Sequence, residues 1–226
     1  MDFAPSQTDP AHTCQHPPVF DDAFFEQLID LFRWRRDVRR FRTDPVPQAL
    51  VEELVSMATL APSVGNSQPW RFISVESRER RQKVIEDFNL CNAEALKTYE
   101  GERAARYARL KLSGLREAPI HLAVFCDMET LAGKRLGRLT MPETLSYSVV
   151  AAIQILWLAA RARGLGLGWV SILHPDVLKK TLDVPAEWQF IAYLCLGYPQ
   201  EEHEDPELVR SQWQARLAEP GRLLHR

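Results

Sequence analysis

The sequence predicts a three-layer α/β domain in which a central mixed sheet of about four to five strands is flanked by helices. Segments with helical periodicity alternate with short apolar runs, an order that is typical of layered α/β folds. Two runs, residues 119–127 and 188–197, are almost continuously apolar, as expected of strands covered on both sides. Residues 149–160 contain Gln154 as their only polar side chain, so this helix must lie in a core or a subunit interface.

Composition and charge restrict the classes of function. The chain of 226 residues is 46% hydrophobic and 26% charged, which is the balance of a globular domain with one substantial core. Its net charge of −2 creates no field that would attract nucleic acid. The four cysteines lack a C-x-x-C spacing and the six histidines are scattered. We therefore expect a cytoplasmic protein with no bound metal and with neither a nucleic-acid nor a membrane partner.

The N-terminal part of the chain divides into an arm and a helix. Residues 1–19 are polar and rich in proline, so we expect a flexible arm before a single domain over residues 20–226. The first helix is predicted over residues 21–36. Asp21 or Asp22 can cap it, because an aspartate side chain accepts a hydrogen bond from the first free amides of a helix.

Two further helical regions follow. One is predicted over residues 47–60 and ends before Pro62, because the residue that precedes a proline is disfavoured in the helical region. The strongly charged residues 77–117 predict one or two surface helices, with breaks near residues 89–92 and at Gly101.

The remaining elements complete the layered pattern. A strand is predicted over residues 71–75, and residues 128–140 are expected to be irregular. The apolar helix is predicted over residues 143–163, and a glycine-rich turn then leads into another strand. A short helix is expected over residues 174–182, before the last strand.

The stretch of residues 33–42 holds six arginines and one acid, Asp37. Like charges at this density repel one another unless an anion lies among them, and guanidinium groups suit phosphate or carboxylate. The preference of cations for a helix C-terminus would explain two or three of these arginines, but not six around an aspartate. We therefore predict an anion site in this stretch.

Two loops carry further polar or glycine-rich patterns. Residues 61–70 contain two prolines and a glycine, and Ser63, Asn66 and Gln68 there can hydrogen-bond a planar heterocycle or a polyol. The alternative is that turn chemistry alone explains this loop as a connection between a helix and a strand. The glycines of residues 164–171 allow close backbone approach, but a helix precedes them, which is the wrong context for a dinucleotide-binding motif.

Three features coincide in this chain: the arginine-rich turn, the A-P-S-x-G-N-S-Q-P-W loop, and the G-L-G-x-G-W-V-S turn after an apolar helix. Together they resemble the nitroreductase-like flavoprotein superfamily over about residues 25–200. The resemblance implies the nitroreductase-like fold, an intertwined homodimer, and FMN held at the interface between the subunits.

Within the superfamily, the sequence is most similar to the branch that destroys reduced FMN with O₂. The matching segments include R-R-D-V-R at residues 35–39 and G-W-V-S-I at residues 168–172, whereas Asn66 and Ser67 follow the general nitroreductase loop. This branch implies that reduced FMN is the substrate, O₂ the co-substrate, and the lower ligand of vitamin B12 the product, with erythrose 4-phosphate released. NAD(P)H is one candidate source of electrons, and a separate flavin reductase is another.

The resemblance also implies roles for particular residues. Asp37 would act as general acid or base, and the alternative is an ordinary salt bridge to its arginine neighbours. Ser171 would hydrogen-bond the flavin edge and favour fragmentation over release of hydrogen peroxide. Arg216, on a helix predicted to carry Trp213 as well, would join three earlier arginines as a ligand of the phosphate. The full set of expected flavin-binding residues is Arg35, Arg36, Asp37, Val38, Arg39, Ser63, Asn66, Gln68, Lys111, Gly166, Gly168, Ser171 and Arg216.

Two other functions stay open from the sequence. An NAD(P)H-dependent flavin reductase or nitroreductase would retain FMN, so that the purified protein would be yellow and would reduce nitroaromatic compounds. A non-catalytic flavin-binding protein would bind FMN without turnover.

Overall fold

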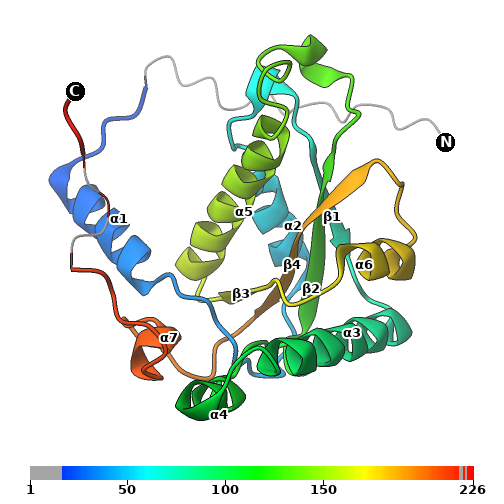
Figure 1. Ribbon diagram of the computed structural model, residues 1–226. Helices are drawn as coiled ribbons and strands as arrows, with labels where there is room; N and C mark the ends of the chain where they lie inside the picture. The colour runs from blue at the N-terminus through cyan, green and yellow to red at the C-terminus, as the bar shows by residue number, and fades with distance from the viewer. Residues whose placement is uncertain (1–16, 219–220, 222) are drawn as a thin grey trace.

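A computed structural model describes residues 17–218, 221 and 223–226 (Figure 1). Most of the expected N-terminal arm lies outside these residues, as does Cys14. The elements in chain order are α1 (Asp22–Trp34), α2 (Gln48–Ala58), the short 3₁₀ turn η2 (Val64–Asn66), β1 (Trp70–Ser74), α3 (Arg78–Leu96), α4 (Gly101–Arg109), β2 (Ile120–Asp127), the 3₁₀ turn η3 (Ala132–Arg135), α5 (Thr144–Ala162), β3 (Gly166–Val170), α6 (Pro175–Leu182), β4 (Trp188–Gly197) and α7 (Glu207–Arg210).

Local side-chain chemistry sets several helix ends. The carboxylate of Asp21 accepts a hydrogen bond of 2.8 Å from a backbone amide in the first turn of α1, which satisfies one amide that lacks a helical partner. Ser77 caps α3 in the same way at 3.3 Å. α6 begins at Pro175, whose fixed φ suits the first helical position. It ends where Asp183 adopts a left-handed conformation with φ of 55°.

The structure corrects two expectations about the helices. α3 continues through residues 89–92 to Leu96, because the asparagines there are tolerated in a helix that contains neither glycine nor proline. Trp213 and Arg216 lie beyond α7, which ends at Arg210, because Gln212 adopts a left-handed φ of 57°. Trp213 is held instead by edge-on packing against aromatic rings of the α3–α4 region, including Tyr99 at 5.4 Å between centroids.

The four described strands form one sheet in the order β1-β2-β4-β3, and all three pairings are antiparallel. The expectation of a mixed sheet is therefore wrong for these strands. Among the described residues, the one parallel pairing outside them is the isolated bridge between Asp37 and Leu167. An apolar run indicates that a strand is covered on both faces, but it carries no information on the direction of the neighbouring strand.

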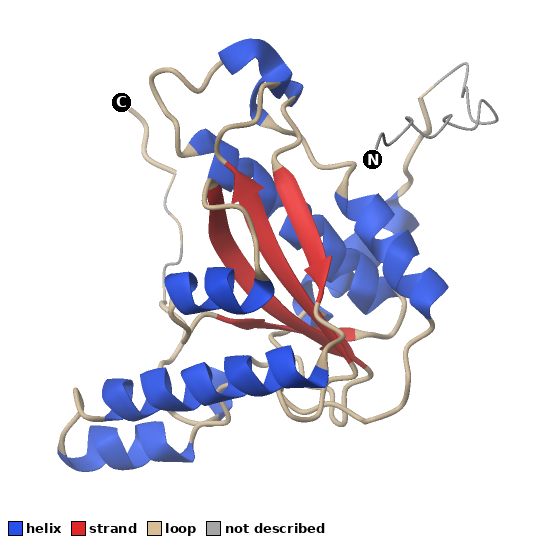
Figure 2. Cartoon of the chain, turned by 90° about the vertical axis from the view of Figure 1, so that its right-hand side faces the viewer, coloured by secondary structure: helices blue, strands red, loops and turns tan. Residues whose placement is uncertain are grey.

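The sheet separates two apolar cores, which confirms the predicted three-layer fold (Figure 2). Helices α2 and α5 cover one face, and α3 and α6 cover the other. Successive residues of β2 alternate between the cores, since Val124 joins the first and Phe125 the second. α5 is long and apolar enough to cross a membrane by length and composition, but half of its most apolar window is buried inside the fold.

A buried imidazole lies in the core between the sheet and α3. His121 is only 1% exposed, and its Nδ1 lies 3.0 Å from the hydroxyl oxygen of Tyr193. Burial lowers the pKa of His121 to about 3, and the charge of Arg81 acts in the same direction, because the charged ring would lose its hydration. The unfolded chain, with an ordinary pKa of about 6.5, binds this proton first as the pH falls. Stability is therefore lost from about pH 6.5 downward until the folded form also titrates near pH 3.

We expect this imidazole to dominate the acid sensitivity of the fold. Between about pH 7 and pH 5, the free energy of unfolding should fall by on the order of 2 kcal/mol more in the native protein than in His121→Gln. Urea unfolding at the two pH values measures the difference. The same pH dependence in both proteins would contradict the assignment.

Candidate functional site

The arginine stretch runs in extended form along the edge of the sheet beside β3. The amide of Val38 donates to the carbonyl oxygen of Leu167 at 3.0 Å. On the other side, the indole N–H of Trp157 on α5 donates to the carbonyl oxygen of Arg36 at 3.2 Å. These bonds fix the backbone from which the charged side chains project.

Two glycines of β3 permit this close approach. A Cβ on Gly168 would lie 2.1 Å from the carbonyl oxygen of Val38, and one on Gly166 would lie 2.7 Å from the Val38 side chain. The close approach predicted at these glycines is thus made by Val38 of the same chain, through its backbone at Gly168 and its side chain at Gly166. A direct flavin contact at either glycine stays a prediction.

Asp37 is oriented by two donors. Its Oδ1 accepts from the amide of Trp169 at 2.9 Å, and its Oδ2 accepts from Nε of Arg39 at 2.8 Å. Arg39 in turn donates to the carbonyl oxygen of Lys111 at 2.9 Å, and its side chain is only 13% exposed. The salt bridge that the sequence offered as an alternative is therefore present. The carboxylate itself keeps 31% exposure, so it can still reach a bound molecule.

The six arginines differ in their partners. Arg35 lies with its guanidinium 4.7 Å from the ring centroid of Trp157. Arg36 donates to the carbonyl oxygens of Arg35 and Glu204. The others pair with carboxylates of the described residues: Arg33 with Asp30, Arg39 with Asp37, Arg40 with Glu201 and Glu207, and Arg42 with Asp44.

The guanidinium groups of Arg35, Arg36 and Arg216 therefore lie near one another. No carboxylate of the described residues is bonded to any of the three. Burial lowers the pKa of Arg35, and Asp37 opposes this shift. The pKa of Arg36 is lowered first by burial and then by the charges of Arg35 and Arg216, against two acids of the segment after β4. Arg216 is exposed, and it lies close enough to Arg36 for its charge to lower the pKa of that guanidinium. This grouping favours a bound dianion.

The loop of residues 61–70 is also well ordered by its own contacts. The hydroxyl oxygen of Ser63 accepts from the amide of Gln68 at 3.1 Å, and the amide of Val64 donates to Oγ of Ser148 on α5 at 3.0 Å. Asn66 and Gln68 adopt positive φ values of 55° and 46°. The side-chain amide of Gln68 donates to Oδ1 of Asn66 at 3.4 Å.

Within one chain, the loop and the arginine stretch lie at opposite ends of α5 (Figure 1). Ser148 contacts the loop, whereas Trp157, nine residues further along the helix, contacts Arg36. At 1.5 Å per residue the two contacts are about 14 Å apart along the axis. The expected site residues thus form two separate groups, one at each end of α5.

The remaining expected residues belong to the arginine group. Ser171 directly follows β3 and is exposed, two positions beyond the amide that holds Asp37. Lys111 contributes its carbonyl oxygen to Arg39, while its ammonium group pairs with Glu117 at 2.6 Å.

Trp157, which contacts both Arg35 and the Arg36 backbone, was not among the residues expected at the site. The available signal was an indole within an otherwise apolar helix, because buried tryptophan N–H groups need an acceptor.

Comparisons with known proteins show the family of this chain. The model of the Nitroreductase family matches residues 32–198. A 5,6-dimethylbenzimidazole synthase of Rhodospirillum rubrum is 59% identical over 203 residues, which cover 90% of this chain and 96% of the relative. A protein of the same name from Rhodobacter capsulatus is 46% identical and covers 88% of this chain and 96% of its own length. The solved structure of an iodotyrosine deiodinase bound to FMN and 3-iodo-L-tyrosine has a similar fold, with a TM-score of 0.65, 23% identity, and coverage of 88% of this chain and 97% of that one.

Proposed function

Because this chain belongs to the nitroreductase family, we propose that it is an enzyme, a 5,6-dimethylbenzimidazole synthase that fragments reduced FMN with O₂. The product would be the lower ligand of vitamin B12. The high identity to two synthases along nearly their whole length supports this activity. The observation in the fold that carries it is a part-exposed carboxylate, held by two donors, beside guanidinium groups to which no carboxylate of the described residues is bonded.

The FMN phosphate would bind to Arg35, Arg36 and Arg216. A phosphate is a dianion with several acceptor oxygens, and guanidinium groups supply charge-assisted hydrogen bonds to it. Stacking on Trp157 holds Arg35 in place. Arg39, in contrast, is occupied by Asp37 and by the Lys111 carbonyl, so we assign it to positioning Asp37.

Reduced FMN, as substrate, supplies the ring that reacts with O₂ and the ribityl carbons that are cleaved. Asp37 would take or give a proton at the ribityl chain, and the Trp169 amide and Arg39 would fix its direction. Ser171, at the same end of β3, would hydrogen-bond the flavin edge.

A second copy of the chain would complete the site. The loop with Ser63, Asn66 and Gln68 lies about 14 Å along α5 from the arginines of its own chain, and we assign it to the flavin of a partner subunit. α1 has no buried residue and exposes Phe25 and Phe32 by 58% and 50%. A cavity of about 510 Å³ between α1 and the end of α5 provides an apolar surface for such a partner.

We expect Arg36→Gln to weaken FMN binding by about tenfold to a hundredfold, because a hydrogen bond to a charged group contributes roughly 1.5–3 kcal/mol. Fluorescence titration with FMN measures the dissociation constant. Arg42→Gln is the matched control, since Arg42 is paired with Asp44 at 2.8 Å and exposed. Equal losses in both variants would argue against a phosphate site at Arg36.

We expect Ser171→Ala to uncouple oxygen consumption from product formation. Without the hydroxyl, more of the reduced flavin should return to FMN with release of hydrogen peroxide. Peroxide and benzimidazole measured in the same reaction give the ratio, and an unchanged ratio would rule out the proposed role.

The function itself is tested by aerobic incubation with FMN and a reductant. In one arm NAD(P)H is added alone, and in the other it is added with a separate flavin reductase, so that the two electron sources are distinguished. A benzimidazole product in either arm supports the proposal. We place the reaction in the cytoplasm, where NAD(P)H and flavin reductases occur. Retained yellow FMN and reduction of nitroaromatic compounds without that product would indicate a nitroreductase instead.

A further inference from the structure

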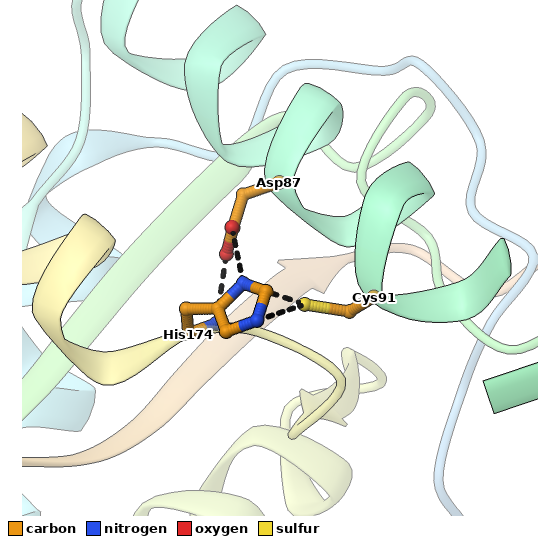
Figure 3. Close-up of side chains that lie close together, drawn as sticks. All are labelled: Asp87, Cys91 and His174. Atoms are coloured by element: carbon orange, nitrogen blue, oxygen red, sulfur yellow. Dashed lines mark hydrogen bonds and ion pairs between the residues drawn. The ribbon is translucent and has the colours of Figure 1, made fainter. Parts of the chain in front are cut away.

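Three side chains of metal-binding types meet between α3 and the start of α6 (Figure 3). Asp87 and Cys91 lie four residues apart on α3 and so project from the same face. His174 occupies the N-cap position of α6. Its Nδ1 lies 2.8 Å from Oδ1 of Asp87 and 3.0 Å from Sγ of Cys91, and all three ligand atoms lie within 4.8 Å of one another.

The cluster is built on a fixed carboxylate. The Asp87 side chain is only 4% exposed, and its Oδ2 accepts from the amide of His174 at 2.8 Å. Arg80 also donates to the carbonyl oxygen of Leu182 at 3.0 Å, and α3 and α6 share one apolar core. The two helices are therefore joined without the thiol of Cys91. Asp87 and Glu94 also place negative charge around the thiol, which a cation would offset.

We propose that Asp87, Cys91 and His174 bind a thiophilic divalent cation of the zinc class, with a fourth position left for water. Sulfur, imidazole nitrogen and carboxylate oxygen are the donors that zinc takes in proteins, whereas magnesium and calcium prefer oxygen alone. On binding, the thiol gives up its proton to solvent and sulfur bonds to the cation as thiolate. The neutral imidazole carries its hydrogen on Nε2, so that Nδ1 exchanges its contact with Asp87 for a bond to the cation, and no oxidation state changes.

The spacing of the donors is compatible with such an ion. Bonds of about 2.0 Å to nitrogen and about 2.3 Å to sulfur at tetrahedral angles separate nitrogen from sulfur by about 3.5 Å. The present contact of 3.0 Å therefore widens by about half an ångström on loading. Cys91 is partly exposed and the His174 side chain is 46% exposed, so both side chains have room to move outward while Asp87 stays in place.

The position of the site suggests what the ion would stabilise. His174 follows Ser171 by three residues in the connection from β3 to α6. A cation bridging His174 to α3 would fix that connection. The metal site itself does not depend on the flavin chemistry, and its test uses no flavin, so the two proposals can fail separately.

Cobalt(II) is the probe, because a cobalt–thiolate bond gives a near-ultraviolet charge-transfer band and four-coordinate cobalt absorbs strongly in the visible. The titration uses full-length Cys14→Ser protein under a non-thiol reductant, so that the thiol outside the described residues makes no contribution. We expect one equivalent to bind with both spectral features, and zinc to displace it. Binding without the charge-transfer band would overturn the proposal.

Two variants locate the site. Adding Cys91→Ser should remove the band and weaken the affinity for cobalt by at least about a hundredfold, since even outer partners of metal ligands are worth roughly 10–100-fold. Adding His203→Gln instead should change neither, because that imidazole pairs with Glu201 elsewhere. Persistence of the band in Cys91→Ser, or its loss in His203→Gln, would refute the assignment.

A measurement on the native protein covers the case in which Cys91→Ser does not fold. Zinc should slow alkylation of Cys91 by at least about tenfold, as followed by peptide mass spectrometry, because a metal-bound thiolate is shielded from the reagent. The buried Cys126 and Cys195 serve as internal references. An alkylation rate of Cys91 that does not respond to zinc would contradict the site.

Discussion

Asp37→Asn is expected to lower the rate of benzimidazole formation by about 10²–10⁴-fold, the range that positioned proton transfer contributes. Asparagine keeps the shape of the side chain, and its carbonyl oxygen can still accept from the Trp169 amide, which now lies 2.9 Å from the carboxylate. It cannot exchange a proton, however, and it removes the charge that holds Arg39. A single-turnover reaction of reduced FMN with O₂, followed by chromatography of the product, measures the rate.

Asp44→Asn is the matched control for this prediction. Asp44 also forms an arginine pair of 2.8 Å, with Arg42, but it lies on the exposed side of the stretch. We expect this variant to form product at the native rate. FMN affinity is measured in both variants to separate binding from chemistry. If Asp37→Asn turned over as fast as the native protein, the carboxylate would be a structural partner of Arg39 only.

Gly168→Ala is expected to lower the free energy of unfolding by about 3 kcal/mol, the upper end of the usual cost of overpacking. The added Cβ would lie 2.1 Å from a backbone oxygen, that of Val38, which cannot rotate aside as a side chain could. The segment must move away from β3, so Asp37 should also lose its bond to the Trp169 amide and activity should fall. Urea unfolding measures the loss of stability.

Gly164→Ala separates this clash from ordinary glycine effects. Gly164 has a φ of 72°, but its added Cβ would meet nothing within 4 Å. Gly164→Ala should lower the free energy of unfolding by about 1–2 kcal/mol, the cost of a left-handed conformation for a residue other than glycine. A Gly168→Ala protein as stable as Gly164→Ala would mean that Val38 does not pack against this strand.

The layered fold could be predicted because its strands and central helix are defined by local composition. The last strand has the predicted bounds, Trp188–Gly197, and α5 matches its prediction to within one residue at each end. The direction of the strands could not be predicted, because residues covered on both faces look alike in either orientation. α3 and the C-terminal segment were mispredicted where asparagine and tryptophan gave ambiguous local signals.

The sequence was sufficient to predict which charged residues belong to the candidate site. The density of arginines around Asp37 indicates an anion site without any structure. The partners of those arginines were not predictable, since Arg40 pairs with Glu207 and Arg39 with a carbonyl 72 residues away. Only the folded structure shows that Arg35 and Arg36 have no carboxylate bonded to them among the described residues and so remain available to a phosphate.

The sequence by itself determined the layered class of the fold, the family resemblance and the residue types of the proposed chemistry. Only the tertiary structure decided which charges are neutralised, that Val38 fills the space beside Gly166 and Gly168, and that His174 meets Cys91 across 83 residues of sequence. The physical reason is that composition and periodicity report whether each residue prefers water or a core. Hydrogen bonds and ion pairs depend instead on atoms that approach within about 3 Å, and chain folding alone sets those distances.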